Sequence, residues 1–265
     1  MLKFVYLQES RKTSGMKLKS VSKIMALVVV MLAPIYMSGK KVNNEGYPKA
    51  GAYPLFIRHI LKPSFEATLS AQYYDALNLA SFGLSKPVFD AALKGFNKLM
   101  TKGLLNKDSI LTIADFSKSS REKRLYVLDL KNMKVLFNTF VAHGRGSGMD
   151  YARSFSNKPR SNKSSLGFYI TQDTYFGSNG YSLRLSGLER GYNDKAAFRE
   201  IVMHGADYVS EDFANDAGHL GRSLGCPAIP MGEHKDIIDS VKNGSLIFLY
   251  YNDKKYLHSS KLLNG

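Results

Sequence analysis

The feature that most constrains this fold is a series of short β-type segments that runs from Ser109 almost to the end of the chain. The segments are rich in β-branched, aromatic and aliphatic residues, and loops of Gly, Ser and Asn separate them. We expect strands at 110–116, 125–130, 135–141, 167–171, 181–185, 201–203 and 246–250. Such short strands predict a mainly β fold with a sandwich or barrel-like core. Short helices are expected at 195–200, with Asp194 as the cap, and at 232–242.

Before the β region, apolar spacing predicts two short helices. Ser64 is a suitable N-cap for the first and Gly83 would end it. Its apolar residues recur at helical spacing: Leu69, Tyr73, Ala76, Leu77 and Ala80. Lys86-Pro87 opens the second helix, whose apolar face holds Val88, Ala91, Ala92, Phe96 and Leu99. Two helices of this length cannot bury both apolar faces by themselves, so we expect a helical appendage that packs on the β domain.

The N-terminal region has the pattern of an export signal. A basic lead-in at 16–23 precedes an apolar run at 24–37, which is short for a membrane span and typical of a signal-peptide core. Cleavage is expected near Ser38-Gly39, and it would leave no membrane span; an uncleaved helix is the alternative. We therefore expect a signal peptide or N-terminal anchor at 1–39, a linker and the helical appendage at 40–107, and the β domain at 108–265.

The charge and the cysteine content exclude several functions. The formal net charge is +15, which suits an anionic partner such as nucleic acid, a membrane surface or an anionic polymer. No nucleic-acid-binding motif is present, so an anionic polymer of a cell envelope is the expected partner. A single cysteine, Cys226, rules out an intramolecular disulfide. The six histidines show no paired ligand spacing, so we expect neither a metal nor another cofactor.

Residues 202–230 carry the candidate active site. Cys226 lies between a glycine and a proline in a loop-like stretch, and His204 lies upstream at the end of an expected strand, followed by Gly205. A thiol needs a base to become a nucleophile at neutral pH, and imidazole is the usual one. The alternatives are a buried, inert cysteine and a structural histidine.

The His-Gly pair at 204–205 followed by Ser-x-Gly-Cys at 223–226 resembles the catalytic signature of the L,D-transpeptidases that act on bacterial peptidoglycan. Further blocks resemble the murein L,D-transpeptidase catalytic-domain family: Ala-His-Gly-Arg at 142–145, Ser-Ser-Leu-Gly at 164–167 and Gly-Leu-Glu-Arg-Gly-Tyr-Asn-Asp at 187–194. The resemblance covers residues 125–251 and implies a mainly β fold. The wider family usually has histidine in place of Leu224 and a polar or basic residue soon after the cysteine, where this chain has Pro227-Ala228.

The resemblance implies the roles of two residues of the site, and the chemistry of the remaining residues suggests theirs. Cys226 would be the nucleophile and His204 its general base. The backbone N–H groups of Gly225 and Cys226 would stabilise the oxyanion, and Ser223 would either orient the site or only form a turn. The residues expected to contact the stem peptide are Arg222, Gly205, His143, Arg145 and Tyr208. Arg222 is the candidate for the donor carboxylate, because a guanidinium pairs bidentately with a carboxylate.

Three functions remain open on the sequence alone. The first is a cysteine acyltransferase, exported to the bacterial cell envelope, that joins peptidoglycan stem peptides through an acyl-enzyme. The second is a carboxypeptidase that trims the same stems with water as the acceptor. The third is a non-catalytic envelope-binding protein in which Cys226 is inert. A papain-like hydrolase is disfavoured, because in that class the cysteine precedes the histidine.

Overall fold

The computed structural model describes residues 67–265, so the expected export signal and the predicted N-cap Ser64 lie outside the described residues. Within this part, one sheet has the strand order β3-β2-β1-β8-β4-β5-β6-β7. Its strands are β1 (Ile110–Asp115), β2 (Leu125–Asp129), β3 (Lys134–Thr139), β4 (Gly167–Gly177), β5 (Gly180–Gly187), β6 (Val202–Ala206), β7 (Ala228–Pro230) and β8 (Leu246–Tyr250). The pairs β1–β8 and β6–β7 are parallel, and the other neighbours are antiparallel.

The two edge strands of this sheet approach each other. Just beyond β3, Ala142 forms an antiparallel bridge with Ala228 of β7, and its N–H lies 2.8 Å from the Ala228 carbonyl oxygen. Gly144 forms a second bridge, with Ser223. The sheet therefore nearly closes into a barrel, and the prediction of a mainly β, barrel-like fold is confirmed. The loop that carries Cys226 lies at this closing seam, immediately before β7.

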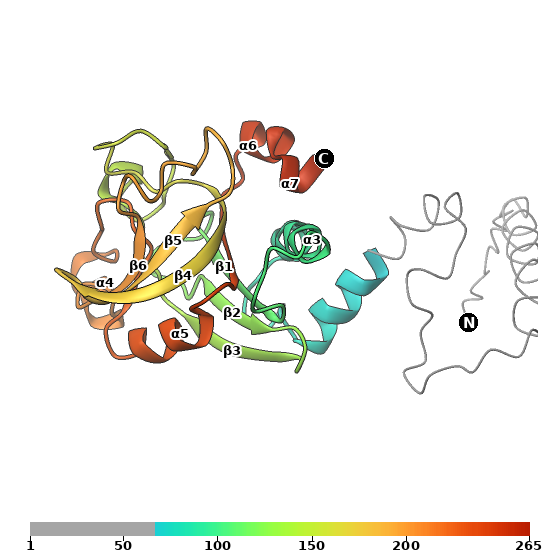
Figure 1. The fold of residues 1–265 in the computed structure, drawn as a ribbon. Helices are drawn as coiled ribbons and strands as arrows, with labels where there is room; N and C mark the ends of the chain where they lie inside the picture. Colours follow the sequence, from blue (N-terminus) through green and yellow to red (C-terminus); the bar gives the residue numbers. More distant parts are fainter. Residues whose placement is uncertain (1–66) are drawn as a thin grey trace, which may run out of the picture. The chain divides into compact units, whose positions relative to one another are not determined.

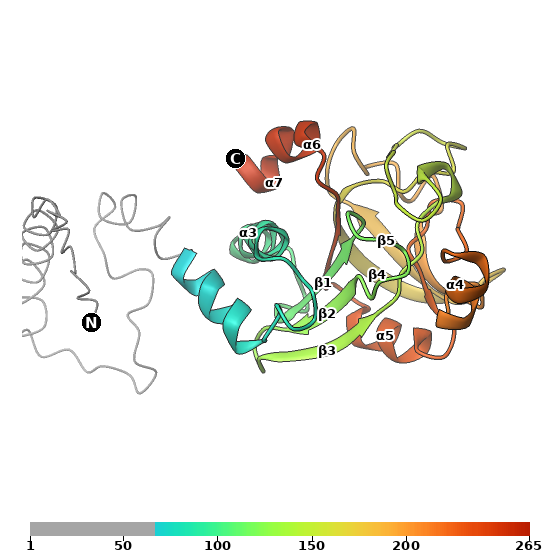
Figure 2. The same cartoon turned by 180° about the vertical axis from the view of Figure 1, so that it is seen from behind.

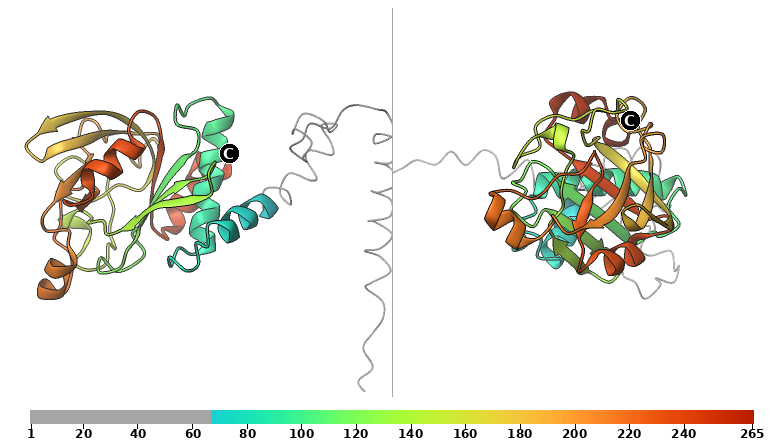
Figure 3. Two further views of the ribbon diagram at one scale, coloured as in Figure 1. Left: turned by 90° about the horizontal axis from the view of Figure 1, so that it is seen from below. Right: turned by 90° about the vertical axis from the view of Figure 1, so that its left-hand side faces the viewer.

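The sheet has an apolar core on each face, because its central strands bury both sets of alternating side chains. In β8, Leu246 and Phe248 belong to one core, whereas Ile247 and Leu249 belong to the other. Helix α3 (Lys86–Thr101) covers the first face, next to the C-terminal helices α6 (Lys254–Ser259) and α7 (Lys261–Asn264), as Figures 1 and 2 show. Helix α5 (His234–Val241) packs on the other face, on β5 and β6 (Figure 3).

Helix α3 forms where the sequence predicts it. It begins with a proline in its first turn, where the missing N–H costs nothing, and it buries an apolar face against β1 and β8. Gly95 allows the closest approach, because a Cβ there would lie 2.2 Å from the ring of Phe168 in β4. The expected packing of this helix on the β domain is thus present in the structure.

Two predicted helices differ from the structure. The first ends at residue 76 instead of near Gly83, because Asn78 adopts a left-handed conformation (φ 49°) and the Leu79 N–H bonds back to the Tyr74 carbonyl. Residues 195–200 form consecutive turns and no helix. There Asp194 does not cap a helix, because its carboxylate accepts from the Gly191 N–H and from the side chain of Asn157.

Several short elements were not predicted. They are β7, the 3₁₀ helix η1 (Arg145–Ser147), α4 (Glu211–Ala217), α6 and α7. Ser210 caps α4 by accepting from the Phe213 N–H, and Asp253 caps α6 in the same way from Tyr256. No helix among residues 67–265 is both long and apolar enough to cross a membrane.

Candidate active site

The loop that carries Cys226 is held by Ser223. The Ser223 hydroxyl donates to the Cys226 carbonyl oxygen (2.6 Å) and accepts from the Gly225 N–H (3.0 Å). The backbone of Ser223 is bonded on both sides, to the carbonyl of His143 and to the N–H of Arg145. Ser223 therefore fixes the path of the backbone on either side of the cysteine.

Gly225 occupies a position that only glycine can fill. Its φ is +132°, and a Cβ there would lie 2.9 Å from the Lys163 carbonyl oxygen. Its N–H is engaged by the Ser223 hydroxyl. A role for the Gly225 N–H in an oxyanion hole would therefore require that this hydrogen bond be exchanged for one to the substrate.

The sulfur of Cys226 lies against the backbone at the start of β6. The Val202 N–H donates to Sγ (3.5 Å), and the thiol donates to the Glu200 carbonyl oxygen (3.6 Å). Only 8% of the residue is exposed. Burial raises the pKa of the thiol, and the N–H groups of Val202 and of Cys226 itself, with the charge of Arg199, offset this only partly. The resting form at neutral pH is therefore the thiol.

His204 lies in β6, two residues beyond the N–H that contacts the sulfur. In the parallel β6–β7 pair His204 is opposite Ala228, so His204 lies beside the residue two positions beyond Cys226. Its Nδ1 lies 2.9 Å from the Gly205 carbonyl oxygen, which can only accept, so Nδ1 carries the proton and Nε2 keeps its lone pair. Burial lowers the pKa of His204, which favours the neutral imidazole that a general base requires.

No hydrogen bond joins the two side chains in the described part of the chain. Within residues 67–265, the hydrogen bonds of Cys226 Sγ go to backbone atoms of β6 and the preceding turn, and none joins Sγ to His204. Proton transfer between them therefore requires a side-chain rearrangement or an intervening water. Catalytic hydrogen bonds are commonly longer or misaligned in the absence of substrate.

Of the residues expected to contact a stem peptide, some are accessible to solvent and the others are buried. Arg145 is exposed, and Arg222 and Tyr208 are half-buried. Gly205 is covered by His234, whose ring would lie 2.7 Å from a Cβ at that position. His143 is fully buried, with both ring nitrogens bonded inside the protein, which corrects the expectation that it contacts the substrate directly.

A comparison with protein families identifies the family of this chain. The family described as L,D-transpeptidase catalytic domain matches residues 81–250, more than half of the chain. This chain belongs to that family. The resemblance derived from the sequence is thereby confirmed.

Solved L,D-transpeptidase structures are similar to this chain. One is L,D-transpeptidase 1 from Mycobacterium tuberculosis, with 15% identity, a TM-score of 0.31, and coverage of 54% of this chain and 62% of that one. A second, from Mycobacterium smegmatis, has 14% identity, a TM-score of 0.32, and coverage of 54% and 59%. A third, from Stackebrandtia nassauensis, has 12% identity, a TM-score of 0.34, and coverage of 63% and 68%. The chain thus spans less than two thirds of the two mycobacterial proteins. No curated protein matches it.

Arg222 directly precedes Ser223 in the loop that carries Cys226. Its Nη1 lies 2.9 Å from Met149 Sδ and 3.3 Å from the Gly148 carbonyl oxygen. Among the described residues no ion pair involves Arg222. Glu189 is buried and accepts hydrogen bonds from the Phe168 N–H and from the hydroxyls of Tyr256 and Ser260. The guanidinium therefore keeps donors for a ligand.

Arg124 and His143 form a buried pair that adjoins the cysteine loop, because the His143 carbonyl oxygen accepts from the Ser223 N–H. Arg124 is fully buried and bonds to the carbonyls of Lys118 and Val141, and its Nη2 lies 2.8 Å from His143 Nδ1. A guanidinium only donates, so His143 Nδ1 accepts, and Nε2 carries the proton that faces the Gly148 carbonyl. Burial, together with the charge of Arg124, lowers the pKa of His143 to about 4.

This pair predicts a pH-dependent stability. The pKa of His143 is lower in the folded state than in the unfolded state. Its contribution to the free energy of unfolding is therefore complete above pH 6.5 and is lost as the pH falls toward about 4. His143→Asn keeps an acceptor for Arg124 but does not titrate. We expect the wild type to lose about 3 kcal/mol more unfolding free energy than this variant between pH 7 and pH 4. Urea unfolding followed by circular dichroism measures the difference; parallel pH profiles would contradict the assignment, and the exposed His258→Asn is the control.

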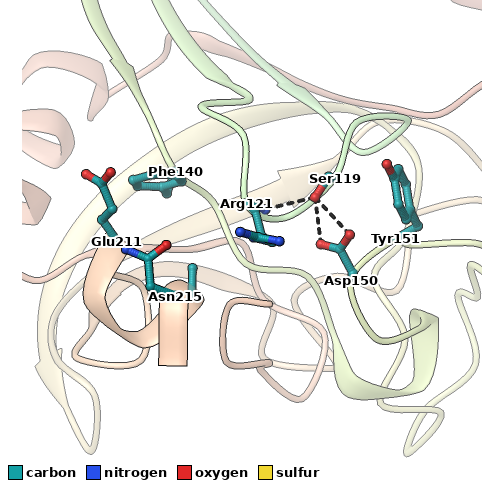
Figure 4. A pocket seen from close by; sticks show the side chains of 8 residues that line it. Ser119, Arg121, Phe140, Asp150, Tyr151, Glu211 and Asn215 are labelled. Atoms are coloured by element: carbon teal, nitrogen blue, oxygen red, sulfur yellow. Dashed lines mark hydrogen bonds between the residues drawn. The ribbon is translucent and has the colours of Figure 1, made fainter. Parts of the chain in front are cut away.

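Two hollows lie elsewhere on the domain. Figure 4 shows one of about 440 Å³, with Arg121 at its centre, Phe140, Glu211 and Asn215 on one side, and Asp150 and Tyr151 on the other. A second, of about 400 Å³, shares Phe140 and Glu211 and reaches the ends of β6 and β7. Cys226 lines neither hollow, which agrees with the burial of its sulfur. In the described residues no three His, Cys, Asp or Glu side chains gather as metal ligands.

Sequence reasoning did not identify Arg199 and Arg124 as parts of the site. Arg199 stands shortly before the expected strand 201–203, and its position in a predicted helix hid its relation to the cysteine. Arg124 directly precedes another strand and looks like an ordinary surface cation. The only signal in the sequence was the position of each arginine, just before an expected strand within or beside the residues that resemble the family.

Proposed function

We propose that this protein is a cysteine acyltransferase that cleaves and rejoins L,D-peptide bonds of peptidoglycan stem peptides, with Cys226 as the nucleophile and His204 as the general base. The observation that carries the proposal is the placement of the thiol on the backbone of β6 two residues before a neutral His204. Membership of the L,D-transpeptidase family supports the same chemistry.

The reaction follows from these two groups. His204 Nε2 takes the thiol proton while Sγ attacks the carbonyl carbon of the L,D-peptide bond, so that a C–S bond forms. The C–N bond then breaks, and the imidazolium gives its proton to the departing amine of the terminal D-residue. An acceptor amine attacks the thioester, loses a proton to His204, and releases the thiolate, which is reprotonated. The net result exchanges one amide bond for another.

The backbone around Cys226 supplies the remaining parts. The backbone N–H of Cys226 is the proposed donor to the oxygen of the attacked carbonyl group. Ser223 holds the carbonyl of Cys226 and thereby keeps this N–H in position. Arg222 is the proposed contact for the carboxylates of the donor stem. Arg145 and Tyr208, which belong to other sequence motifs, are proposed as further contacts.

The acceptor decides the outcome. An amine acceptor gives cross-linking, whereas water gives a carboxypeptidase that trims the stem. We propose export to the bacterial cell envelope, because the substrate lies there and because the +15 charge suits its anionic polymers. Mass analysis of purified muropeptides after incubation with the purified protein tests the proposal. Joined stems support transpeptidation, loss of the terminal D-residue supports the carboxypeptidase, and unchanged muropeptides would reject both.

Arg222→Lys tests the donor-binding role. The variant keeps the charge but loses the planar fork, so we expect kcat/KM for stem peptides to fall by about tenfold. Alkylation of Cys226 by iodoacetamide, a small neutral reagent, should be unchanged, because the activating groups are intact. If Arg222 only supports the loop through Gly148 and Met149, then thermal stability, alkylation and turnover will all fall together.

A further inference from the structure

Arg199 is a cation held in a cage of backbone and serine oxygens. Its Nη1 donates to the Ser156 carbonyl (2.7 Å) and to the Ser165 hydroxyl, and its Nη2 donates to the Lys163 carbonyl (2.6 Å). Among the described residues no carboxylate pairs with it. The side chain is half-buried. The protein therefore keeps a positive charge partly out of water, where hydrogen bonds to neutral oxygens stabilise it in place of a carboxylate.

The same short segment forms the surroundings of the sulfur. Glu200 and Val202, which follow Arg199 closely, supply the carbonyl and the N–H that contact Cys226 Sγ. On the other side, the guanidinium borders Gly225, where a Cβ would lie 3.2 Å from Nη2. Arg199 is thus adjacent in space both to the residue before the nucleophile and to the backbone that touches the nucleophile.

Among the described charged groups around the sulfur, Arg199 is the one that favours the thiolate form of Cys226. Burial lowers the pKa of His204, so the imidazole is neutral and contributes no positive charge to the resting site. The carboxylate of Glu200 opposes ionisation of the thiol, and Tyr208 interacts with the same sulfur. Arg199 acts in the opposite direction, and Cys226 in turn raises the pKa of Arg199 against its own burial. A thiolate formed in this buried position would need such a compensating charge.

We propose that Arg199 is a positioning residue that holds a fixed positive charge beside Cys226 and stabilises its thiolate, while His204 removes the proton. The inference rests on the proposed function only in taking Cys226 as the nucleophile. In this arrangement the base and the stabilising charge are separate groups. The cation remains in place throughout the reaction, and the imidazole is free to carry the proton to the leaving amine.

The test measures alkylation of the full-length protein by iodoacetamide between pH 5 and pH 10, read by intact mass. Cys226 is the only cysteine, so a single adduct reports on it. We expect Arg199→Gln to raise the midpoint of the alkylation profile by about one pH unit and to slow alkylation at pH 7 by about tenfold. Arg199→Lys, which keeps the charge, should restore most of this loss. An unchanged midpoint in Arg199→Gln would overturn the proposal.

Two control variants separate charge from scaffold. Ser165→Ala removes a hydrogen bond of the cage but leaves the guanidinium charged, and Arg190→Gln removes an exposed charge from the preceding turn. Neither should move the midpoint. A shift in Ser165→Ala equal to that in Arg199→Gln would overturn the proposal in favour of a scaffold role, and an equal shift in Arg190→Gln would overturn it in favour of a general surface field.

Folding and substrate turnover are read separately. If Arg199→Gln does not fold, Arg199→Lys and Ser165→Ala are the remaining test, and a shifted midpoint in both overturns the proposal. Muropeptide turnover is measured on the same preparations. A wild type that shows the Arg199-dependent midpoint but leaves muropeptides unchanged would reject the proposed function and still support the role of Arg199.

Discussion

Cys226→Ser is expected to reduce stem-peptide turnover by at least about 1,000-fold while leaving the fold intact. The two side chains have nearly the same shape, and the position is buried, so the loop should be retained. A serine hydroxyl is far harder to ionise than a thiol, and one neutral imidazole with no carboxylate behind it is a weak activator. Within the described residues, the partner of His204 Nδ1 is a backbone carbonyl. Turnover is measured by mass analysis of muropeptides, and folding by circular dichroism.

The acyl-enzyme gives this prediction a second readout. Incubation of the wild type with a donor stem should produce a mass adduct equal to the stem less its terminal D-residue, and Cys226→Ala should show none. If Cys226→Ser turns over muropeptides at a rate close to that of the wild type, the nucleophile assignment is wrong. If the adduct persists in Cys226→Ala, another residue carries the acyl group.

The second large effect is expected for His204→Ala. Loss of a general base typically costs about 100- to 10,000-fold, and we expect turnover to fall within this range. Because burial lowers the pKa of His204 below 6.5, the imidazole stays neutral in mildly acidic solution. The acid limb of the wild-type rate profile should therefore lie below pH 6.5. The measurement is kcat/KM for a stem peptide from pH 4 to pH 9, because this ratio reports the ionisations of the free enzyme.

Alkylation of the thiol separates activation from substrate binding. His204→Ala should slow the reaction of Cys226 with iodoacetamide near neutral pH, because the thiol loses its proton acceptor. His258→Ala is a matched control, since His258 is an exposed histidine in α6 outside the site. Coincident alkylation profiles for the wild type and His204→Ala would show that another group activates Cys226.

Local patterns were sufficient to predict much of the framework. Alternating and β-branched runs identified the segments that became β1, β2, β3, β4, β5, β6 and β8, because these strands bury residues whose spacing is visible over a few positions. Helix α3 was predicted for the same reason, from its opening proline and its apolar face. The pair His204 and Cys226 was identified as a candidate because a glycine follows the histidine and another precedes the cysteine in a loop-like setting.

Short elements and turns escaped prediction because contacts distant in sequence define them. Strand β7 holds only Ala228–Pro230, and it is a strand because β6 pairs with it. The turns at 190–200 replace a helix because Asp194 bonds Asn157, far away in sequence, and the Asn193 side chain bonds to backbone of residues 168 and 189. No periodicity within the segment itself reports these partners.

The sequence by itself identified the residues that are proposed to carry the chemistry, since a lone thiol, an upstream imidazole and flanking glycines are local features. The tertiary structure decided their electrical state. Burial against β6 keeps Cys226 protonated and His204 neutral, and Arg124 beneath the loop removes His143 from the surface. It also brought Arg199 beside Gly225. Solvation and charge act through space and depend on everything that packs around a group, so they follow from the closed barrel and not from the order of residues along the chain.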